Sequence, residues 1–256
     1  MSMTMPEIER TLKQLRLSGV RATLETRIVQ AQSANQAFLE TFSLILQDEL
    51  DRRRSRLIER RYQQSGLVER LTLAEFDWGF NPKLPRQACF ELHTLKFIAQ
   101  ADNAILIGPP GTGKSHLCKA IAYNAILQGY RVCYLDTDEF LTEHALSVPA
   151  ARKTRLRPMI DADLVVLDDL FLSKRIPEGG AELLQSLIHQ RYKLRRSLIV
   201  TSNRMIADWG AYLGDNTTAT TLLDRLMHRS HLLEFQGKSY RLKEAAEKLA
   251  RQPKSR

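Results

Sequence analysis

The sequence predicts an α/β fold in which helices flank a parallel sheet, preceded by a small all-helical N-terminal unit. Three observations predict it. Apolar residues recur at helical spacing over residues 8–71. The apolar run 104–107 then leads through a glycine-rich turn into a helical stretch, 117–128. A further apolar run, 131–136, follows as a second strand, and strand, helix and strand in this order are typical of a parallel sheet.

The helical unit is expected to cover residues 1–72. Ser33, with Gln36 three residues later, resembles a capping box that opens a helix near Phe38. The whole unit is therefore expected to consist of helices joined by short turns.

The stretch 73–84 breaks the helical period and is rich in turn residues. It is expected to join the two units, and its aromatic residues could also pack onto the second one. We place the boundary near Leu73, so residues 73–256 form the second domain.

A glycine-rich segment follows the first predicted strand and matches the pattern G-x-x-x-x-G-K-[ST]. Its glycines let backbone N–H groups close around phosphate oxygens, and the following helix adds the positive end of its dipole. Lys114 would reach the β- and γ-phosphates, and the Ser115 hydroxyl would bind Mg²⁺. A chance glycine-rich turn is the competing explanation, which the strand and helix on either side disfavour. We expect nucleotide contacts from Gly108, Pro109, Pro110, Gly111, Thr112, Gly113, Lys114, Ser115 and His116.

Polar side chains end the next two predicted strands. The apolar run 163–169 ends in Asp168, expected to hold Mg²⁺ directly or through water, and Asp169, expected to polarise the attacking water. The run 198–203 ends at Asn203, which would reach the attacking water or the γ-phosphate if its strand lies between the other two. Acids at strand ends are common, however, and Asn203 could instead cap a turn.

The chain is basic, with 38 Lys and Arg against 29 Asp and Glu, for a net charge of +9. This excess suggests a polyanionic partner. Arginines crowd the end of the helical unit, where an anionic duplex would relieve their repulsion, although a solvated helix face is the alternative. The segment 150–158 is expected to be a loop, either ordinary surface or the inner lining of a ring or spiral that faces nucleic acid. The candidate DNA contacts are Arg52, Arg53, Arg54, Arg56, Arg60, Arg61, Arg152, Lys153, Arg155 and Arg157.

The cysteines Cys89, Cys118 and Cys133 lack the spacing of a zinc site and are expected to be reduced thiols packed in the protein. The N-terminus has no apolar core of a signal peptide, and no stretch is long enough to cross a bilayer. We therefore expect a cytoplasmic protein with no membrane partner.

Several motifs occur in an order and spacing that resemble the IstB-like ATPases, the transposition helper proteins of an insertion-sequence family. Those proteins are AAA+ P-loop NTPases related to the DnaC helicase loaders. The main motifs are 108–115, 164–169, 201–203, 224–226 and 237–241, and weaker similarities are 76–78, 191–192, Trp209 and the arginine-rich end of the helical unit. The resemblance covers nearly the whole chain. Beyond the phosphate loop, no single motif is specific.

The resemblance implies catalytic roles for three residues. Arg225 would be an arginine finger that enters the nucleotide site of a neighbouring subunit, a role that strongly accelerates hydrolysis in other NTPases. Asn203 would be the first sensor, and Arg241 the second sensor, reaching the γ-phosphate of its own subunit from a short C-terminal lid. ATP would then bind at the interfaces of a homo-oligomer.

The resemblance also implies what this ATPase does. With ATP and Mg²⁺ it would assemble on duplex DNA, deform the DNA and recruit a cognate transposase, which in turn would stimulate hydrolysis and disassembly. Typical AAA+ enzymes have Glu where this chain has Asp169. Because the shorter side chain holds a water less closely, slow and switch-like turnover is expected.

Three alternatives stay open at this point. A DnaC-like replicative helicase loader would use the same nucleotide site with a different protein partner. A small-molecule P-loop kinase would be a monomer with its catalytic arginines in cis. An ATP-binding adaptor would bind nucleotide without hydrolysing it.

Overall fold

The chain forms two compact units, Met1–Arg60 and Arg61–Arg256. The computed structural model describes residues 3–144, 149–173, 176–213 and 216–251. The units divide inside a helix, ahead of the boundary that we placed near Leu73, so residues 61–72 pack with the second unit. Among the described residues, no helix has the length and apolar character needed to span a membrane.

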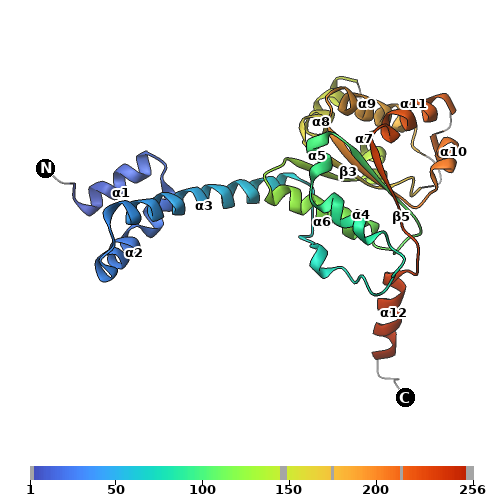
Figure 1. Ribbon diagram of the computed structural model, residues 1–256. Coiled ribbons are helices and arrows are strands. Elements are labelled where there is room, and N and C mark those ends of the chain that lie inside the picture. Colours follow the sequence, from blue (N-terminus) through green and yellow to red (C-terminus); the bar gives the residue numbers. More distant parts are fainter. Residues whose placement is uncertain (1–2, 145–148, 174–175, 214–215, 252–256) are drawn as a thin grey trace, which may run out of the picture. The chain divides into compact units, whose positions relative to one another are not determined.

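Helices build the N-terminal unit: α1 (Met5–Gln14), α2 (Ser18–Ala34) and the first part of α3 (Phe38–Gln64) (Figure 1). A buried carboxylate joins two of them, because Glu49 on α3 accepts hydrogen bonds from the backbone N–H groups of Gly19 and Val20 at 2.5 and 3.3 Å. A Cβ at Gly19 would collide with the α3 backbone. The glycine therefore lets the start of α2 approach α3 closely.

The capping box predicted at Ser33 is wrong. Ser33 lies inside α2, and its hydroxyl donates a hydrogen bond to the carbonyl oxygen of Gln30 at 3.0 Å. The helix ends at Asn35, whose left-handed backbone (φ 47°) is a conformation that asparagine tolerates well. The polar residues near position 33 thus mark the end of one helix and not the start of the next.

The second unit contains a parallel sheet in the order β2-β3-β4-β1-β5, as the α/β prediction requires. Its strands are β1 (Asn103–Ile107), β2 (Val132–Asp136), β3 (Leu164–Leu170), β4 (Ser197–Ser202) and β5 (Ser230–Glu234). β4 lies between β1 and β3, the position that Asn203 needs in order to reach a nucleotide. The phosphate loop, the paired aspartates and Asn203 therefore emerge side by side at the carboxyl edge.

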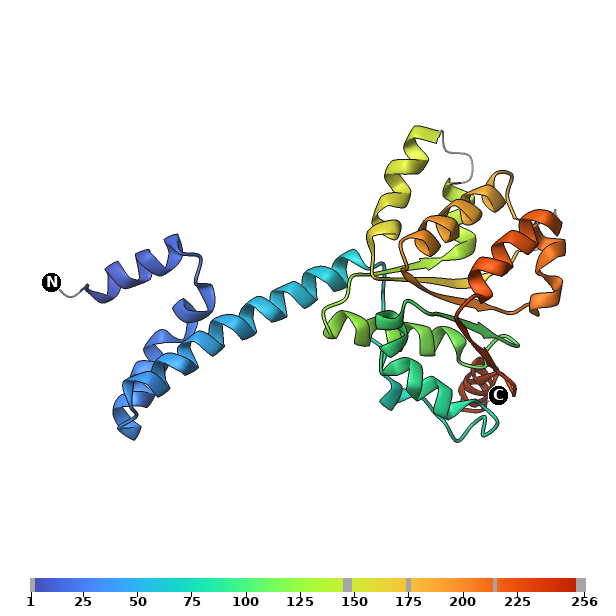
Figure 2. The same ribbon diagram turned by 45° about the horizontal axis from the view of Figure 1, so that its top comes forward.

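Helices cover both faces of the sheet (Figure 2). One face carries α4 (Arg86–His93), α5 (Lys96–Gln100) and α6 (Lys114–Leu127); the other carries α7 (Thr137–His144), α8 (Pro149–Asp161), α9 (Gly180–Lys193), α10 (Trp209–Leu213) and α11 (Asn216–Met227). On the α9 side, the core includes Ile105, Val165 and Val200. The residues that alternate with them along the same strands point to the α6 side. Because both faces of β1, β3 and β4 are buried, these strands read as nearly continuous apolar runs.

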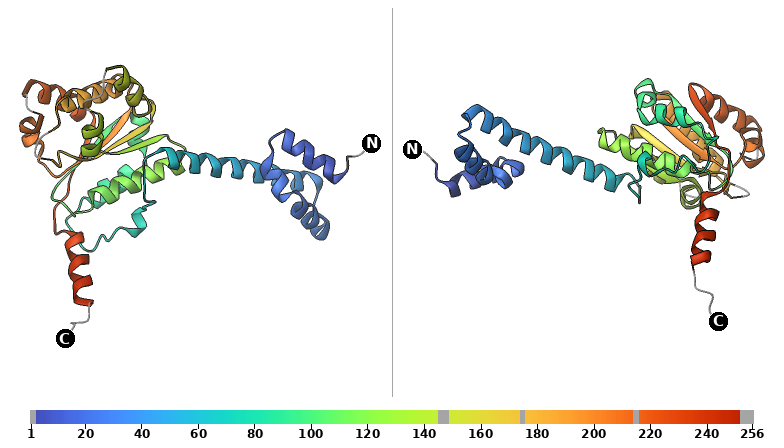
Figure 3. Two further views of the ribbon diagram at one scale, coloured as in Figure 1. Left: turned by 180° about the vertical axis from the view of Figure 1, so that it is seen from behind. Right: turned by 60° about the horizontal axis from the view of Figure 1, so that its bottom comes forward.

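Shorter elements complete the unit. The turns η1 (Leu73–Glu75) and η2 (Ile206–Asp208) precede α4 and α10 respectively. After β5 the chain enters α12 (Tyr240–Arg251), which points away from the sheet (Figure 3). Only the start of α12 approaches the phosphate loop, through the hydrogen bond from the backbone N–H of Tyr240 to the carbonyl oxygen of Gly111 at 2.9 Å.

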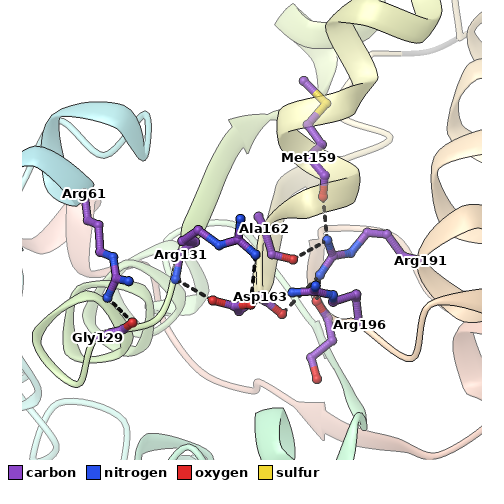
Figure 4. Close-up of polar contacts among 9 residues, drawn as sticks. Arg61, Gly129, Arg131, Met159, Ala162, Asp163, Arg191 and Arg196 are labelled. Carbon is purple, nitrogen blue, oxygen red and sulfur yellow. Dashed lines mark hydrogen bonds and ion pairs between the residues drawn. The ribbon is translucent and has the colours of Figure 1, made fainter.

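A fully buried arginine anchors α8 at the amino-terminal edge of the sheet (Figure 4). The Arg191 guanidinium donates to the carbonyl oxygens of Met159 and Ala162, at the end of α8, at 2.5 and 3.0 Å. It also donates to the carbonyl oxygen of Ser197, at the start of β4, at 2.5 Å. Burial lowers the pKa of Arg191 to about 9, so the group stays charged at neutral pH. Since terminal helix carbonyls carry partial negative charge, the cation both caps α8 and fixes it to the sheet.

The loop predicted for residues 150–158 is wrong, because this basic segment belongs to α8. Leu156 and Met159, three positions apart, are buried in the core and hold the helix in place. These two apolar residues are a weak helical signal, and the positive charges around them obscured it in the sequence.

We expect Arg191→Met to lower the free energy of unfolding by about 3 kcal/mol, because several buried carbonyl oxygens lose their donor. Urea unfolding followed by circular dichroism measures the change. The matched control is Lys193→Met, which removes an exposed cation from the same helix and should change stability by less than about 0.5 kcal/mol. Equal stability of the two variants would contradict the anchoring role.

Candidate nucleotide site

The phosphate loop connects β1 to α6 and borders a cavity of about 540 Å³, here called the phosphate-loop cavity. Other parts of the chain line it: residues from the segment 69–84, Asp169 and Asn203 at strand ends, and Tyr240 and Arg241 at the start of α12. Residues predicted from four separate motifs thus share one cavity.

The loop itself divides into two parts. Gly111, Thr112, Gly113, Lys114, Ser115 and His116 line the cavity. Gly108 and Pro109 are not among the lining residues, and their carbonyl oxygens accept hydrogen bonds from Lys114. Pro109 and Pro110 are both exposed. The predicted nucleotide contacts therefore centre on the second half of the loop and the first turn of α6.

Three glycines of the loop have backbone conformations that other residues rarely adopt. Gly108 has φ 143°, Gly111 has φ 78° and Gly113 has φ 102°. A Cβ at Gly111 would collide with Ser239, and one at Gly113 would collide with the ring of Phe76. Glycine is thus needed both for the turn and for the close approach of chain segments from before and after the sheet.

Lys114 is 4% exposed and makes three hydrogen bonds through its ammonium group. It donates to the carbonyl oxygens of Gly108 at 2.7 Å and Pro109 at 2.9 Å, and to Oδ1 of Asn203 at 2.8 Å. Burial lowers the pKa of Lys114 to about 8, and the carboxylates at the end of β3 partly oppose this shift. The cation is thus held among neutral acceptors that a charged phosphate could replace with a stronger interaction.

Asp168 is buried near the end of β3 and accepts hydrogen bonds on both carboxylate oxygens. Ser115 Oγ donates to Oδ1 at 3.1 Å, Thr201 Oγ1 also donates to Oδ1, and the Tyr134 hydroxyl donates to Oδ2. Asp168 and Ser115 could together hold Mg²⁺, a cation that prefers oxygen ligands and takes few of them from the protein. Within the described ranges, no cluster of three His, Cys, Asp or Glu side chains offers another metal site.

Asp169 has a left-handed backbone, φ 53°, which is uncommon outside glycine. Its N–H donates to Thr201 Oγ1 at 2.9 Å, and the register of β3 against β4 shifts between Leu167 and Leu170. This irregularity makes Asp169 line the cavity while Asp168 stays buried. Burial raises the pKa of Asp169, and the nearby charge of Asp168 raises it further. A carboxylate with a raised pKa is the better general base.

The segment 73–84, which belongs to the second unit, packs against the phosphate loop. The Phe76 ring meets His116 edge to face, with centroids 5.3 Å apart. Asn81 exchanges two hydrogen bonds of 2.9 Å with the backbone of Lys238. The aromatic residues of the segment therefore pack onto the second unit, which we considered together with a joining role.

Sequence reasoning missed Tyr134 and Asn81. Tyr134 belongs to no motif, and its place beside Asp168 follows from the pairing of β2 with β3, which periodicity alone does not give. Asn81 hydrogen-bonds Lys238, which lies 157 positions later in the chain. In the sequence, the aromatic residues of 76–78 were the signal that this segment packs against the second unit.

Arg225 does not join the phosphate-loop cavity. It lines a second cavity of about 280 Å³, the basic cavity, beside Asn103 and Leu198 at the amino-terminal ends of β1 and β4. The basic residues of this cavity are Lys193, Arg195, Arg196, Arg225, His228 and Arg229, and its described lining contains no Asp or Glu. Arg225 makes no hydrogen bond or ion pair with another described residue. The site and this arginine therefore lie at opposite edges of the sheet.

The candidate DNA-contacting arginines of α3 differ in their surroundings. Arg53 pairs with Glu49 at 2.6 Å, Arg56 bonds Ser18 at 2.8 Å, and Arg61 donates to the carbonyl oxygen of Gly129. The remaining members, Arg52, Arg54 and Arg60, are exposed and make no ion pair with a described residue. These three have the most freedom to meet an anion.

On α8, Arg157 is exposed and lies 3.6 Å from Asp161. Arg155 is also exposed. The side chains of Arg152 and Lys153 lie outside the described residues. The helix thus presents at least two of its predicted basic residues to solvent.

A parallel sheet in this strand order, with a phosphate loop after β1 and aspartates at the end of β3, defines an AAA+ ATPase. The sequence profile of the IstB-like ATP-binding proteins matches residues 10–248. The chain belongs to that family, and it is an ATPase.

Relatives agree with this membership. The chain is 36% identical over 245 residues to an ATP-binding protein of insertion sequence IS21 from Pseudomonas aeruginosa, covering 94% of this chain and 90% of the relative. It is 31% identical to an ATP-binding protein of insertion sequence IS5376 from Geobacillus stearothermophilus, covering 84% and 85%. The crystal structure of DnaI superposes with a TM-score of 0.57 at 18% identity, covering 65% of this chain and 92% of DnaI, which supports the fold.

ATP affinity should fall as pH rises through about 8, because the pKa of Lys114 lies there and the neutral amine attracts phosphate poorly. If only the protonated form binds, affinity at pH 9 is about tenfold weaker than at pH 7. Titration with a fluorescent ATP analogue measures this dependence.

The control variant is Lys119→Met, which removes another lysine of the same cavity, paired with Glu69 at 2.7 Å. It should keep the pH dependence. Affinity independent of pH from 7 to 9 would show that Lys114 stays protonated throughout.

Proposed function

We propose that this ATPase is a transposition helper that assembles on duplex target DNA when it binds ATP and Mg²⁺, deforms that DNA, and recruits and regulates a cognate transposase. Hydrolysis then drives disassembly. The names of the relatives support this proposal, since those proteins are ATP-binding proteins of insertion sequences. In this proposal residues 1–72 serve DNA binding and oligomerisation, residues 73–256 bind and hydrolyse ATP, and all of this takes place in the cytoplasm.

The position of Arg225 carries the proposal of assembly. This arginine lies across the sheet from its own phosphate loop, in a cavity lined by cations. Arg196 of this cavity pairs with Asp163, whereas Arg225 has no ion pair with a described residue. Crowded cations of this kind favour the binding of an anion beside them. The triphosphate held by an adjacent copy would supply that anion, with Arg225 as the arginine finger and Arg241 as the sensor of the subunit that binds the nucleotide. A ring or spiral of subunits satisfies this geometry.

The side chain of Asp169 supports slow turnover. Its carboxylate lines the phosphate-loop cavity and has a raised pKa, as a general base requires, but it is one methylene shorter than glutamate. A water held less closely is activated less often. The ATP-bound assembly would therefore persist long enough to act as a signal, and Asn203 would orient the γ-phosphate beside Lys114.

A DnaC-like helicase loader is the second candidate function, because the same nucleotide site could act with a different protein partner. The likeness to DnaI supports only the shared fold. Co-purification separates the two functions, since a helper retains a transposase and a loader retains a hexameric helicase.

We expect Arg225→Ala to bind ATP normally but to lose assembly on duplex DNA and to hydrolyse ATP about 10³-fold more slowly. Electron microscopy with a non-hydrolysable ATP analogue and a steady-state ATPase assay are the measurements. Mixing Arg225→Ala with Asp169→Asn should restore part of the activity, because each variant supplies the group that the other lacks. Arg131→Ala, which removes an exposed arginine of the same unit, is the control and should keep both properties.

The absence of recovery in the mixture would argue for a cis role of Arg225. Wild-type protein that stays monomeric with nucleotide, magnesium and duplex DNA would overturn the proposed function as a whole.

Duplex binding should weaken with salt, with a slope of about −0.9 in log affinity per phosphate contacted. Changing Arg52, Arg54 and Arg60 together to Gln should flatten that slope by about 0.9 for each arginine that meets a phosphate. Fluorescence anisotropy at several salt concentrations measures it. The control changes three other exposed cations of the same unit, Arg10, Lys13 and Arg21, to Gln. Equal flattening in both variants would place the contact elsewhere.

A further inference from the structure

The hydrogen bonds of Asp168 come from three separate elements. Ser115 Oγ, on α6, and Thr201 Oγ1, on β4, both donate to Oδ1. Oδ2 accepts its hydrogen bond from the hydroxyl of Tyr134 on β2. A carboxylate fixed through both oxygens has one orientation, whereas one fixed through a single oxygen can turn about its bond to Cβ.

Tyr134 suits this task because its hydroxyl has one hydrogen to donate, and the Asp168 carboxylate accepts it. Tyr134 is not among the described residues that line the phosphate-loop cavity, so we expect any effect on a bound nucleotide to pass through Asp168.

The chain after α3 fixes the backbone of Tyr134. Its N–H donates to the carbonyl oxygen of Ser65, a fully buried residue, at 2.7 Å. Gly66 packs against the carbonyl oxygen of Tyr134, has φ 79°, and leaves no room for a Cβ. Above the ring lies the ammonium of Lys119, 5.7 Å from its centroid. The turn at residues 65–66 thus sets where the tyrosine sits on the edge strand.

We propose that Tyr134 is a positioning residue for the metal site: its hydroxyl orients the Asp168 carboxylate towards Mg²⁺, and the Ser65–Gly66 turn holds Tyr134 in place. This inference rests on the proposed function, in which Asp168 and Ser115 hold Mg²⁺ beside ATP. Residues that orient metal ligands commonly change metal affinity by about 10- to 100-fold when they are removed. Tyr134 is not a catalytic residue, because it touches no reacting group.

The test measures binding of a fluorescent ATP analogue to the full chain as MgCl₂ is added. Tyr134→Phe keeps the ring and loses only the hydroxyl. We expect the Mg²⁺ concentration at half-maximal effect to rise about tenfold, while binding of the analogue in EDTA stays unchanged. The control is Tyr123→Phe, which removes a hydroxyl from another half-buried tyrosine, whose ring meets that of Tyr62 and whose hydroxyl has no hydrogen bond to any residue that the structure describes. It should leave both quantities unchanged.

A second variant tests the turn. Gly66→Ala places a Cβ against the Tyr134 carbonyl oxygen, so it should raise the required Mg²⁺ concentration in the same direction. Thermal unfolding of each variant separates this effect from a general loss of stability.

The possible outcomes separate the two proposals. If the wild-type protein requires Mg²⁺ and Tyr134→Phe requires the same concentration, the positioning role is wrong while the proposed function stands. Weaker binding of Tyr134→Phe in EDTA would also overturn it, because a purely structural role would then explain the loss. Nucleotide binding by the wild-type protein that is indifferent to Mg²⁺ would overturn the metal site itself.

Discussion

The nucleotide site depends on the parallel alignment of β1, β3 and β4, which ends three polar segments at one edge of the sheet. Asp168 is the point where this alignment meets the phosphate loop, because it accepts hydrogen bonds from α6 and from the strands on both sides of β3. A shift of any one strand by a single residue would turn its polar end to the other face. The register of the strands therefore also determines the geometry of the nucleotide site.

Much of the fold and the site could be predicted because each part has a local signal. A phosphate loop needs glycine at fixed spacing, and buried strands are short apolar runs, so β1, β3 and β4 were readable from sequence. Tyr134 was not, since its role depends on which strand lies beside β3. The loop predicted for α8 failed for a related reason. What makes that segment helical is the burial of Leu156 and Met159, which is a property of the tertiary structure.

The two cavities make the two edges of the sheet differ in charge. At the carboxyl edge, Lys114 is buried among acceptors and two aspartates, whereas the lining of the basic cavity at the amino-terminal edge is cationic. In a ring or a spiral, the carboxyl edge of one copy can contact the amino-terminal edge of the next. Such head-to-tail contacts repeat from one subunit to the next. Copies related by a two-fold axis would instead pair like edges. The charges of the two edges thus favour a directional assembly.

The anchoring of α8 by Arg191 has a consequence for how such proteins diverge. Among the described residues, the acceptors of this guanidinium are main-chain carbonyl oxygens, from Met159, Ala162, Asp163 and Ser197. A main-chain acceptor is present whatever amino acid occupies the position. Substitutions at the exposed positions of α8 can therefore accumulate without loosening the helix, provided that Arg191 and the buried residues Leu156 and Met159 are kept. The solvent-facing side of α8 is left open to adapt to new molecules.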